Sequence, residues 1–111
     1  MEALPETINR YFEATNAHDV DRVIECFAVD AVVEDLGEDL ELKGDAAIRK
    51  WIERITGEYQ LAVTPLESAF RGEAIEIITE VSGTFPGSPL KFRYIFKVRD
   101  DSIVFLSTNL I

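Results

Sequence analysis

The 111-residue chain has the length and composition of one small globular domain. Hydrophobic residues make up 47% of the sequence and charged residues 29%, which supplies enough apolar material for a core and argues against disorder. The formal net charge of −10, without a cluster of basic residues, argues against nucleic acid and anionic membranes as partners. A single cysteine, Cys26, and a single histidine, His18, argue against an internal disulfide, a metal site and a Ser-His-Asp triad.

The start of the chain gives no sign of a targeting segment. The sequence Met-Glu-Ala-Leu-Pro has neither the basic start of a signal peptide nor the long apolar run of a membrane span. No repeat, linker or low-complexity stretch interrupts the chain. We therefore expect one domain over residues 1–111, located in the cytoplasm and not in a membrane.

Helical periodicity dominates the first half of the chain. An apolar stripe predicts a first helix that begins near Pro5 and ends with a left-handed residue at Asn16. Asp19 can cap a second, short helix that reaches Phe27, and Asp45 can cap a third. The first stripe consists of Leu4, Ile8, Tyr11, Phe12 and Thr15. The third consists of Ile48, Trp51, Ile52 and Ile55.

Strand signals fill the rest of the sequence. Residues 31–36 and 40–43 are expected to form two short strands, with the acidic segment 38–41 as a solvated hairpin tip. In the second half the period changes to two, which predicts strands over residues 59–70, 73–83, 90–99 and 102–110, the first bent or interrupted at Pro65. The predicted fold is α+β: three helices on the concave face of one curved antiparallel sheet.

Alternation assigns the side chains of the two central strands to two faces. On strand 90–99, Tyr94 is expected to point inward, together with Leu90, Phe92, Phe96 and Val98. Ile78 and Ile95 are expected on the outer face, among charged side chains. They are either a sign of a homodimer through that face or two scattered surface hydrophobes, and the sequence leaves both interpretations open.

Tyr11 and Asp35 are the candidate catalytic pair. Tyr11 lies on the apolar stripe of the first helix, and Asp35 closes an apolar strand. If both face one apolar pocket, the phenol can donate a hydrogen bond to a developing oxyanion while the carboxylate moves a proton. The alternatives are a core tyrosine and an aspartate that hydrogen-bonds the turn at Gly37.

Four stretches between Tyr11 and Trp51 carry a family resemblance. They read Tyr-Phe-Glu-Ala-Thr-Asn-Ala-His-Asp-Val-Asp over 11–21, Cys-Phe-Ala-Val-Asp-Ala over 26–31, Val-Glu-Asp over 33–35 and Lys-Gly-Asp-Ala-Ala-Ile over 43–48. In these stretches, and in the order of its helices and strands, the chain resembles the SnoaL-like polyketide cyclase and ketosteroid isomerase branch of the nuclear transport factor 2-like superfamily. The resemblance implies a cone-shaped fold around an apolar cavity. The superfamily includes isomerases, cyclases, dehydratases, hydrolases and non-catalytic members, so the fold alone does not fix the function.

The resemblance also implies roles for individual residues. Tyr11 matches the isomerase tyrosine that donates to the oxyanion, and Asp35 matches the aspartate that shuttles the proton. The third isomerase residue, a protonated aspartate, has no aspartate counterpart here. Tyr94 falls near its place, and a phenol can donate the same hydrogen bond. The side chains expected to wall the pocket and bind the ligand are Trp51, Phe92, Phe96 and Phe105.

Two functions follow from these observations. The first is a cofactor-independent isomerase or cyclase that acts on a small hydrophobic carbonyl compound, with Asp35 as the base and the two tyrosines as donors. This chemistry requires no metal and no organic cofactor. The second is a non-catalytic module that binds a small hydrophobic ligand or dimerises.

Overall fold

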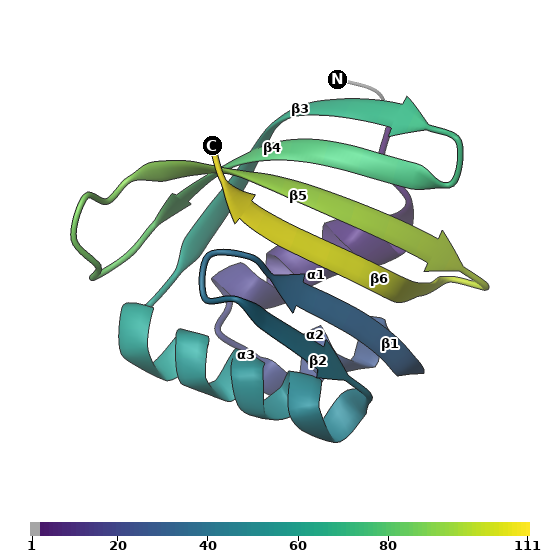
Figure 1. Ribbon diagram of the computed structural model, residues 1–111, viewed down its shortest axis with the longest axis horizontal. Helices are drawn as coiled ribbons and strands as arrows, with labels where there is room; N and C mark the ends of the chain where they lie inside the picture. The colour runs from purple at the N-terminus through teal and green to yellow at the C-terminus, as the bar shows by residue number, and fades with distance from the viewer. Residues whose placement is uncertain (1–2) are drawn as a thin grey trace.

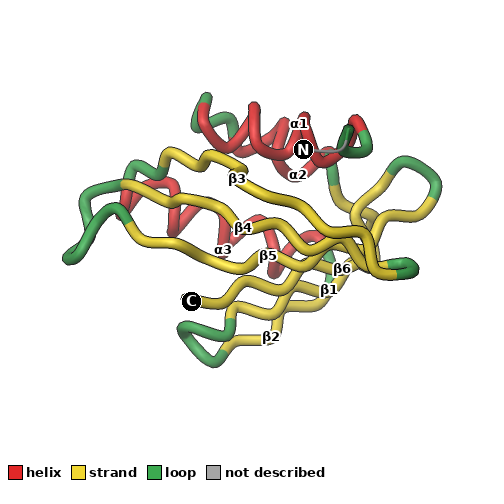
Figure 2. Tube along the Cα trace, turned by 90° about the horizontal axis from the view of Figure 1, so that it is seen from above, coloured by secondary structure: helices red, strands yellow, loops and turns green. Residues whose placement is uncertain are grey.

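The computed structural model describes residues 3–111 as one curved six-stranded sheet with three helices against its concave side (Figures 1 and 2). The helices are α1 (Glu6–Asn16), α2 (Val20–Glu25) and α3 (Asp45–Tyr59). The strands are β1 (Phe27–Asp35), β2 (Leu40–Lys43), β3 (Ala62–Arg71), β4 (Ala74–Ser82), β5 (Leu90–Arg99) and β6 (Ser102–Leu110), in the order β2-β1-β6-β5-β4-β3. The predicted α+β class and the cone-like curvature are confirmed.

One pairing departs from the antiparallel sheet that the sequence predicts. The strands β1 and β6 run parallel, with Asp35 opposite Thr108, whereas all other neighbouring strands are antiparallel. The backbone N–H of Leu36 donates to the carbonyl of Thr108 at 2.9 Å. The two strands come from opposite halves of the chain, so no local hairpin signal reveals their direction. Their pairing joins the hairpin β1–β2 to the long strands of the second half.

Several boundaries differ from the predicted ones. Phe27 begins β1 rather than ending the second helix, and Tyr59 ends α3 rather than starting a strand. Both are apolar residues at junctions, where helical and strand periods fit equally well. Gly44, at a φ of 85°, is the N-cap of α3, and Asp45 occupies the first helical turn, where a carboxylate favours the helix dipole. The irregularity predicted at Pro65 is confirmed by a register shift directly after it.

An aromatic cluster forms the centre of the core between α1 and the sheet. The ring of Phe96 is fully buried and lies edge-on to Tyr11 at 5.5 Å and to Phe12 at 5.9 Å between centroids. Tyr94 stacks on Phe12 at 6.1 Å. The alternation predicted for β5 is confirmed, since Tyr94 and Phe96 on the inner face are buried while Lys91 and Lys97 on the outer face are exposed. This cluster fixes α1 on the inner face of β5.

A side-chain amide ties the end of α1 to the edge of the sheet. Asn16 Nδ2 donates to the carbonyl of Val63 at 2.9 Å, and Asn16 Oδ1 accepts from the Val63 N–H at 2.7 Å. Since β3 is the last strand of the sheet, these backbone groups have no strand partner on that side. Asn16 remains helical, and the left-handed conformation predicted for it is found at His18, with a φ of 56°. The asparagine thus protects an exposed sheet edge.

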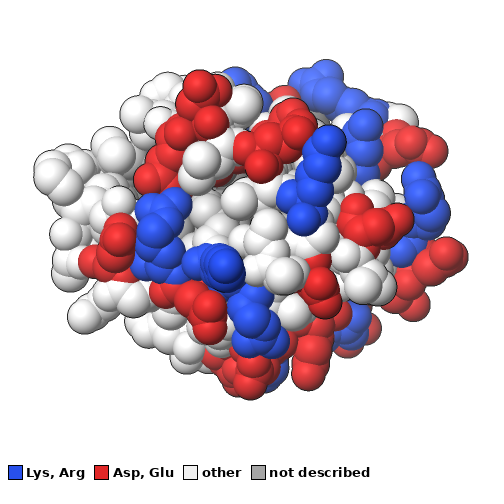
Figure 3. Space-filling view, turned by 60° about the horizontal axis from the view of Figure 1, so that its bottom comes forward, with Lys and Arg blue, Asp and Glu red and all other residues white. Residues whose placement is uncertain are grey.

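The surface mixes charges of both signs. On the face shown in Figure 3, basic and acidic side chains are interspersed rather than gathered into separate patches. One example is Glu76, which lies 3.6 Å from Arg93 and 4.0 Å from Arg71. Exposed pairs of this kind contribute about 0–1 kcal/mol each, so the fold depends on its core rather than on them. Among residues 3–111, no helix has both the length and the apolar character needed to cross a membrane.

The contact between Asn16 and the edge strand predicts a measurable loss of stability. Replacing Asn16 with alanine leaves the N–H and the carbonyl of Val63 without partners, which should lower the free energy of unfolding by about 1–3 kcal/mol in urea titrations. Asn9→Ala is the matched control, because Asn9 is an exposed residue inside the same helix. Equal stabilities of the two variants would contradict the bridging role.

Candidate functional site

A cavity of about 320 Å³ opens between the turn after β1, the helix α3 and the loop over residues 83–89. Its wall is mostly apolar and includes Trp51, Ile55, Leu61, Val81, Phe85, Pro86, Leu90, Phe92 and Leu110. Its polar groups come from Asp35, Glu38, Tyr59, Tyr94 and Thr108. An apolar pocket with a few convergent polar groups is the usual form of a small-molecule site. Within residues 3–111, no three His, Cys, Asp or Glu side chains lie together in a way that could hold a metal ion.

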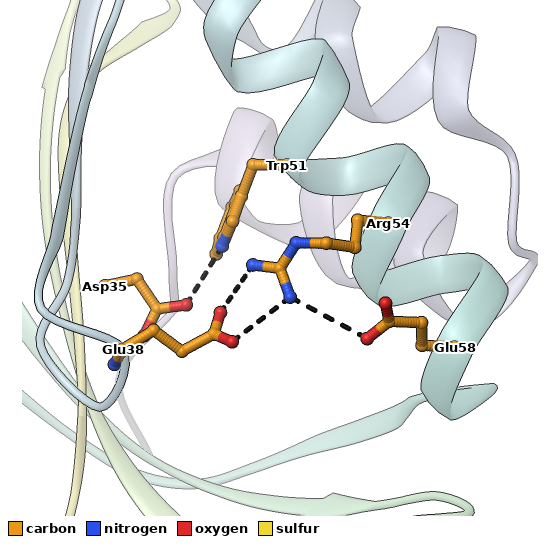
Figure 4. Close-up of polar contacts among 5 residues, drawn as sticks. All are labelled: Asp35, Glu38, Trp51, Arg54 and Glu58. Atoms are coloured by element: carbon orange, nitrogen blue, oxygen red, sulfur yellow. Dashed lines mark hydrogen bonds and ion pairs between the residues drawn. The ribbon is translucent and has the colours of Figure 1, made fainter.

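Asp35 is the buried carboxylate of this cavity. It is the last residue of β1, and 9% of it is exposed. Its Oδ2 accepts a hydrogen bond from Trp51 Nε1 at 2.9 Å (Figure 4), and its Oδ1 accepts one from the backbone N–H of Glu38 at 3.3 Å. The hydrogen bond to the turn that the sequence suggested therefore exists, one residue beyond Gly37. Two donors from different elements fix the orientation of the carboxylate.

The surroundings of Asp35 make it more basic than an exposed aspartate. Burial is the largest cause of its raised pKa, because it disfavours the charged form. The hydrogen bond from Trp51 acts in the opposite direction, and the neighbouring carboxylate of Glu38 raises the pKa again. A carboxylate with a raised pKa in an apolar cavity is suited to accept a proton from a ligand.

The two tyrosines lie at different depths. Tyr94 lines the cavity, whereas Tyr11 packs edge-on against Phe96 and Phe27 and does not line it. Burial is the main cause of the raised pKa of both phenols. The charge of Asp35 raises the pKa of Tyr94 further. The pKa of Tyr11 is raised further by Tyr94 and, more weakly, by Asp35. Both phenols therefore stay protonated at neutral pH and can donate hydrogen bonds.

The structure brings four of the seven predicted site residues to the cavity wall: Asp35, Tyr94, Trp51 and Phe92. Phe96 is instead part of the core cluster. Phe105 packs under Lys97, whose Nζ lies 5.4 Å from the centroid of the phenyl ring. The pair lies next to a register shift between β5 and β6, where the regular strand pairing is interrupted. The catalytic role predicted for Tyr11 stays a prediction.

Sequence reasoning missed Glu38, which it assigned to a solvated hairpin tip. In the structure Glu38 lines the cavity and forms a two-pronged ion pair with Arg54 of α3 (Figure 4). Trp51 and Arg54 are three residues apart on this helix and so lie on the same side of it. That spacing, next to a hairpin with several acidic residues, is the signal that could have located the pair.

The loop over residues 83–89 closes one end of the cavity and is fixed to the end of α3. The N–H of Thr84 donates to the carbonyl of Tyr59 at 2.7 Å, and its hydroxyl donates to the carbonyl of Glu58 at 3.2 Å. The ring of Phe85 lies edge-on to Tyr59 at 6.0 Å. A Cβ atom on Gly83 would overlap the Tyr59 carbonyl, so the close approach depends on glycine.

Comparisons with known proteins identify the family and the fold. The family model described as SnoaL-like domain matches residues 8–106. The structure is similar to that of a candidate polyketide cyclase, protein SMa1630 of Sinorhizobium meliloti. The two are 38% identical, the match covers 96% of this chain and 95% of the other, and the TM-score is 0.88. A comparison with curated proteins finds no match.

Two further solved structures share the fold at lower identity. A protein from Catenulispora acidiphila with a ketosteroid isomerase-like fold, solved in complex with trimethylamine, is 18% identical over 96% of this chain and 86% of its own, with a TM-score of 0.85. TerC, co-crystallized with polyporic acid, is 14% identical over 96% of this chain and 89% of its own, with a TM-score of 0.82. Both similarities show the fold.

The close approach of the loop to α3 predicts opposite effects for two glycine substitutions. Gly83→Ala should lower the free energy of unfolding by about 1–3 kcal/mol, because the new methyl group displaces either the loop or the end of the helix. Gly57→Ala lies inside α3 with no heavy atom within 4 Å of the new Cβ, and should raise stability by about 0.5–1 kcal/mol. Urea titrations measure both, and a stable Gly83→Ala protein would contradict the close approach.

Proposed function

This chain belongs to the SnoaL-like domain family, and from its cavity we propose that it is a cofactor-independent proton-transfer enzyme, an isomerase or cyclase for a small hydrophobic carbonyl compound. The observation that carries the proposal is the cavity wall that Asp35 and Tyr94 share. A fixed base and a protonated donor in an apolar pocket are what enolisation of a ketone needs.

In the proposed mechanism, Asp35 removes a proton from the carbon next to the ligand carbonyl. Trp51 and the N–H of Glu38 hold its carboxylate in one orientation, which lowers the cost of reaching the reactive geometry. The hydroxyl of Tyr94 donates to the enolate oxygen as negative charge develops there. In an isomerase the proton then returns to a different carbon, and in a cyclase the enolate carbon attacks a second carbonyl of the same ligand.

Tyr11 has a supporting role in this proposal. It does not line the cavity, but Tyr94 and Asp35 both raise its pKa, so it lies within electrostatic reach of the reacting groups. We propose that Tyr94 donates directly to the ligand and that Tyr11 supplies the second donor behind it. The effect of Tyr11→Phe should therefore be smaller than that of Tyr94→Phe.

The volume of the cavity limits the ligand. At about 320 Å³ it is near the lower end of the roughly 300–1,000 Å³ range of small-molecule pockets. This favours a compact ligand with one carbonyl end near Asp35 and Tyr94. The apolar remainder would lie against the ring of Phe92, which faces the same space.

The substitution Asp35→Asn tests the role of the base. The assay follows the absorbance change when a small β,γ-unsaturated cyclic ketone isomerises, with a ketosteroid of the same type as a larger comparison. We expect kcat to fall by about 10²–10⁴-fold in Asp35→Asn, and by about 10²–10³-fold in Tyr94→Phe. Asp30→Asn, an exposed aspartate on the same strand, should keep full activity.

Ligand binding separates the catalytic function from its alternative. Since Trp51 is the single tryptophan and lines the cavity, quenching of its fluorescence reports binding. Binding retained with turnover lost supports Asp35 as the base. Turnover unchanged in Asp35→Asn contradicts that role. A wild type that binds the ketone without converting it would favour the non-catalytic binding module.

We further propose a homodimer through the outer face of the sheet. Ile78 and Ile95 lie partly exposed on that face, on adjacent strands β4 and β5. Sedimentation velocity should show a dimer for the wild type and a monomer for Ile95→Arg, because the new charge would be buried in the interface. A monomeric wild type would refute this assembly.

The cytoplasmic location stays a prediction.

A further inference from the structure

Glu38 is a partly exposed carboxylate in the cavity that holds the buried base. It lines the same cavity as Asp35, but 38% of its side chain is exposed, against 9% of Asp35. Its backbone N–H donates to Asp35 Oδ1, and the ionisation of each of the two carboxyl groups affects that of the other. The two acids therefore act as a pair with one buried and one exposed member.

Arg54 keeps the exposed member of this pair charged. Its Nη1 donates to Glu38 Oε1 at 3.1 Å and its Nη2 donates to the second carboxylate oxygen. The hydrogen bond from Arg54 is the main cause of the lowered pKa of Glu38, whereas the pKa of Asp35 is raised. Glu58, one turn further along α3, lies 3.7 Å from the same guanidinium group (Figure 4). When the pair takes up one proton, Asp35 is therefore the carboxyl group that holds it.

The other groups around the pair are donors without charge. Trp51 from α3 donates to Asp35 on the side away from the Glu38 backbone bond. Tyr94 from β5 lines the cavity, and Tyr11 from α1 does not. Both phenols stay protonated at neutral pH because their pKa values are raised. None of these three groups carries a proton from Asp35 outward to solvent in the way that a partly exposed carboxylate can.

We propose that Glu38, positioned by Arg54, is the proton-exchange residue of the site and connects Asp35 with solvent. After Asp35 has taken a proton from the ligand carbon, its O–H bond breaks and a new O–H bond forms on Glu38. Water then removes that proton, and a solvent proton returns by the reverse steps, so charge and protons balance. The inference rests on the proposed function, and it predicts that hydrogen from solvent enters the product.

The first test needs no substrate. The fluorescence of Trp51, followed from about pH 3 to pH 8, should report the ionisation of Asp35, and Asp35→Asn should lack this transition. In Glu38→Gln the midpoint should move to lower pH by about 0.5–1 pH unit, because a neighbouring negative charge that opposes ionisation has been removed. Glu58→Gln is the matched control, since Glu58 also contacts Arg54, and its midpoint should equal that of the wild type. An unshifted midpoint in Glu38→Gln would overturn the inference.

The second test measures solvent exchange during turnover. In D₂O the wild-type product should carry deuterium from solvent, whereas Glu38→Gln should return mainly the hydrogen of the substrate, with at least a severalfold lower deuterium content. Glu58→Gln should behave like the wild type. Equal deuterium contents in Glu38→Gln and the wild type would overturn the relay while leaving Asp35 as the base. A wild type without turnover would overturn the proposed function, and a shifted midpoint would then still support the coupling of the two carboxyl groups.

Discussion

The parallel pairing of β1 with β6 is the constraint on which the site depends. It places Asp35 opposite Thr108, and both residues line the cavity. It also fixes where the chain turns after β1, and therefore where Glu38 meets α3. Without this pairing the hairpin β1–β2 would have no strand neighbour in the rest of the sheet, since β1 is its only link to the long strands in the described chain. This one non-local strand pairing thus joins the hairpin β1–β2 and the strands of the second half into one sheet that walls the cavity.

Within that wall, burial and hydrogen bonding act on Asp35 in opposite directions. Burial destabilises the charged carboxylate, and the hydrogen bond from Trp51 Nε1 stabilises it in part. The result is an ionisable base in a place where its charge is not fully stabilised. For Glu38 the balance is different, because the hydrogen bonds from Arg54 stabilise its charged form and lower its pKa. The contrast between the two acids arises from environment, because their chemistry is the same.

The sequence predicted the features that depend on local periodicity. The apolar stripe of α1, the face of Tyr94 on β5 and the irregularity at Pro65 all follow from residues within a single element, and the structure agrees. The features it missed depend on contacts between distant segments. Neither strand alone reveals that β1 and β6 run parallel, and the register shift beside Phe105 depends on how β5 and β6 pair. Glu38 was missed because its partner, Arg54, belongs to a different element.

The most direct test of the account is the structure of the complex with a small phenol, a planar mimic of an enolate. If Asp35 and Tyr94 form the reacting end of the cavity, the phenol oxygen should lie within about 2.5–3.0 Å of the Tyr94 hydroxyl and next to the Asp35 carboxyl group, with its ring against Phe92. A phenol that binds with its oxygen at the opposite end of the cavity, or only outside it, would contradict the proposed arrangement of base and donor.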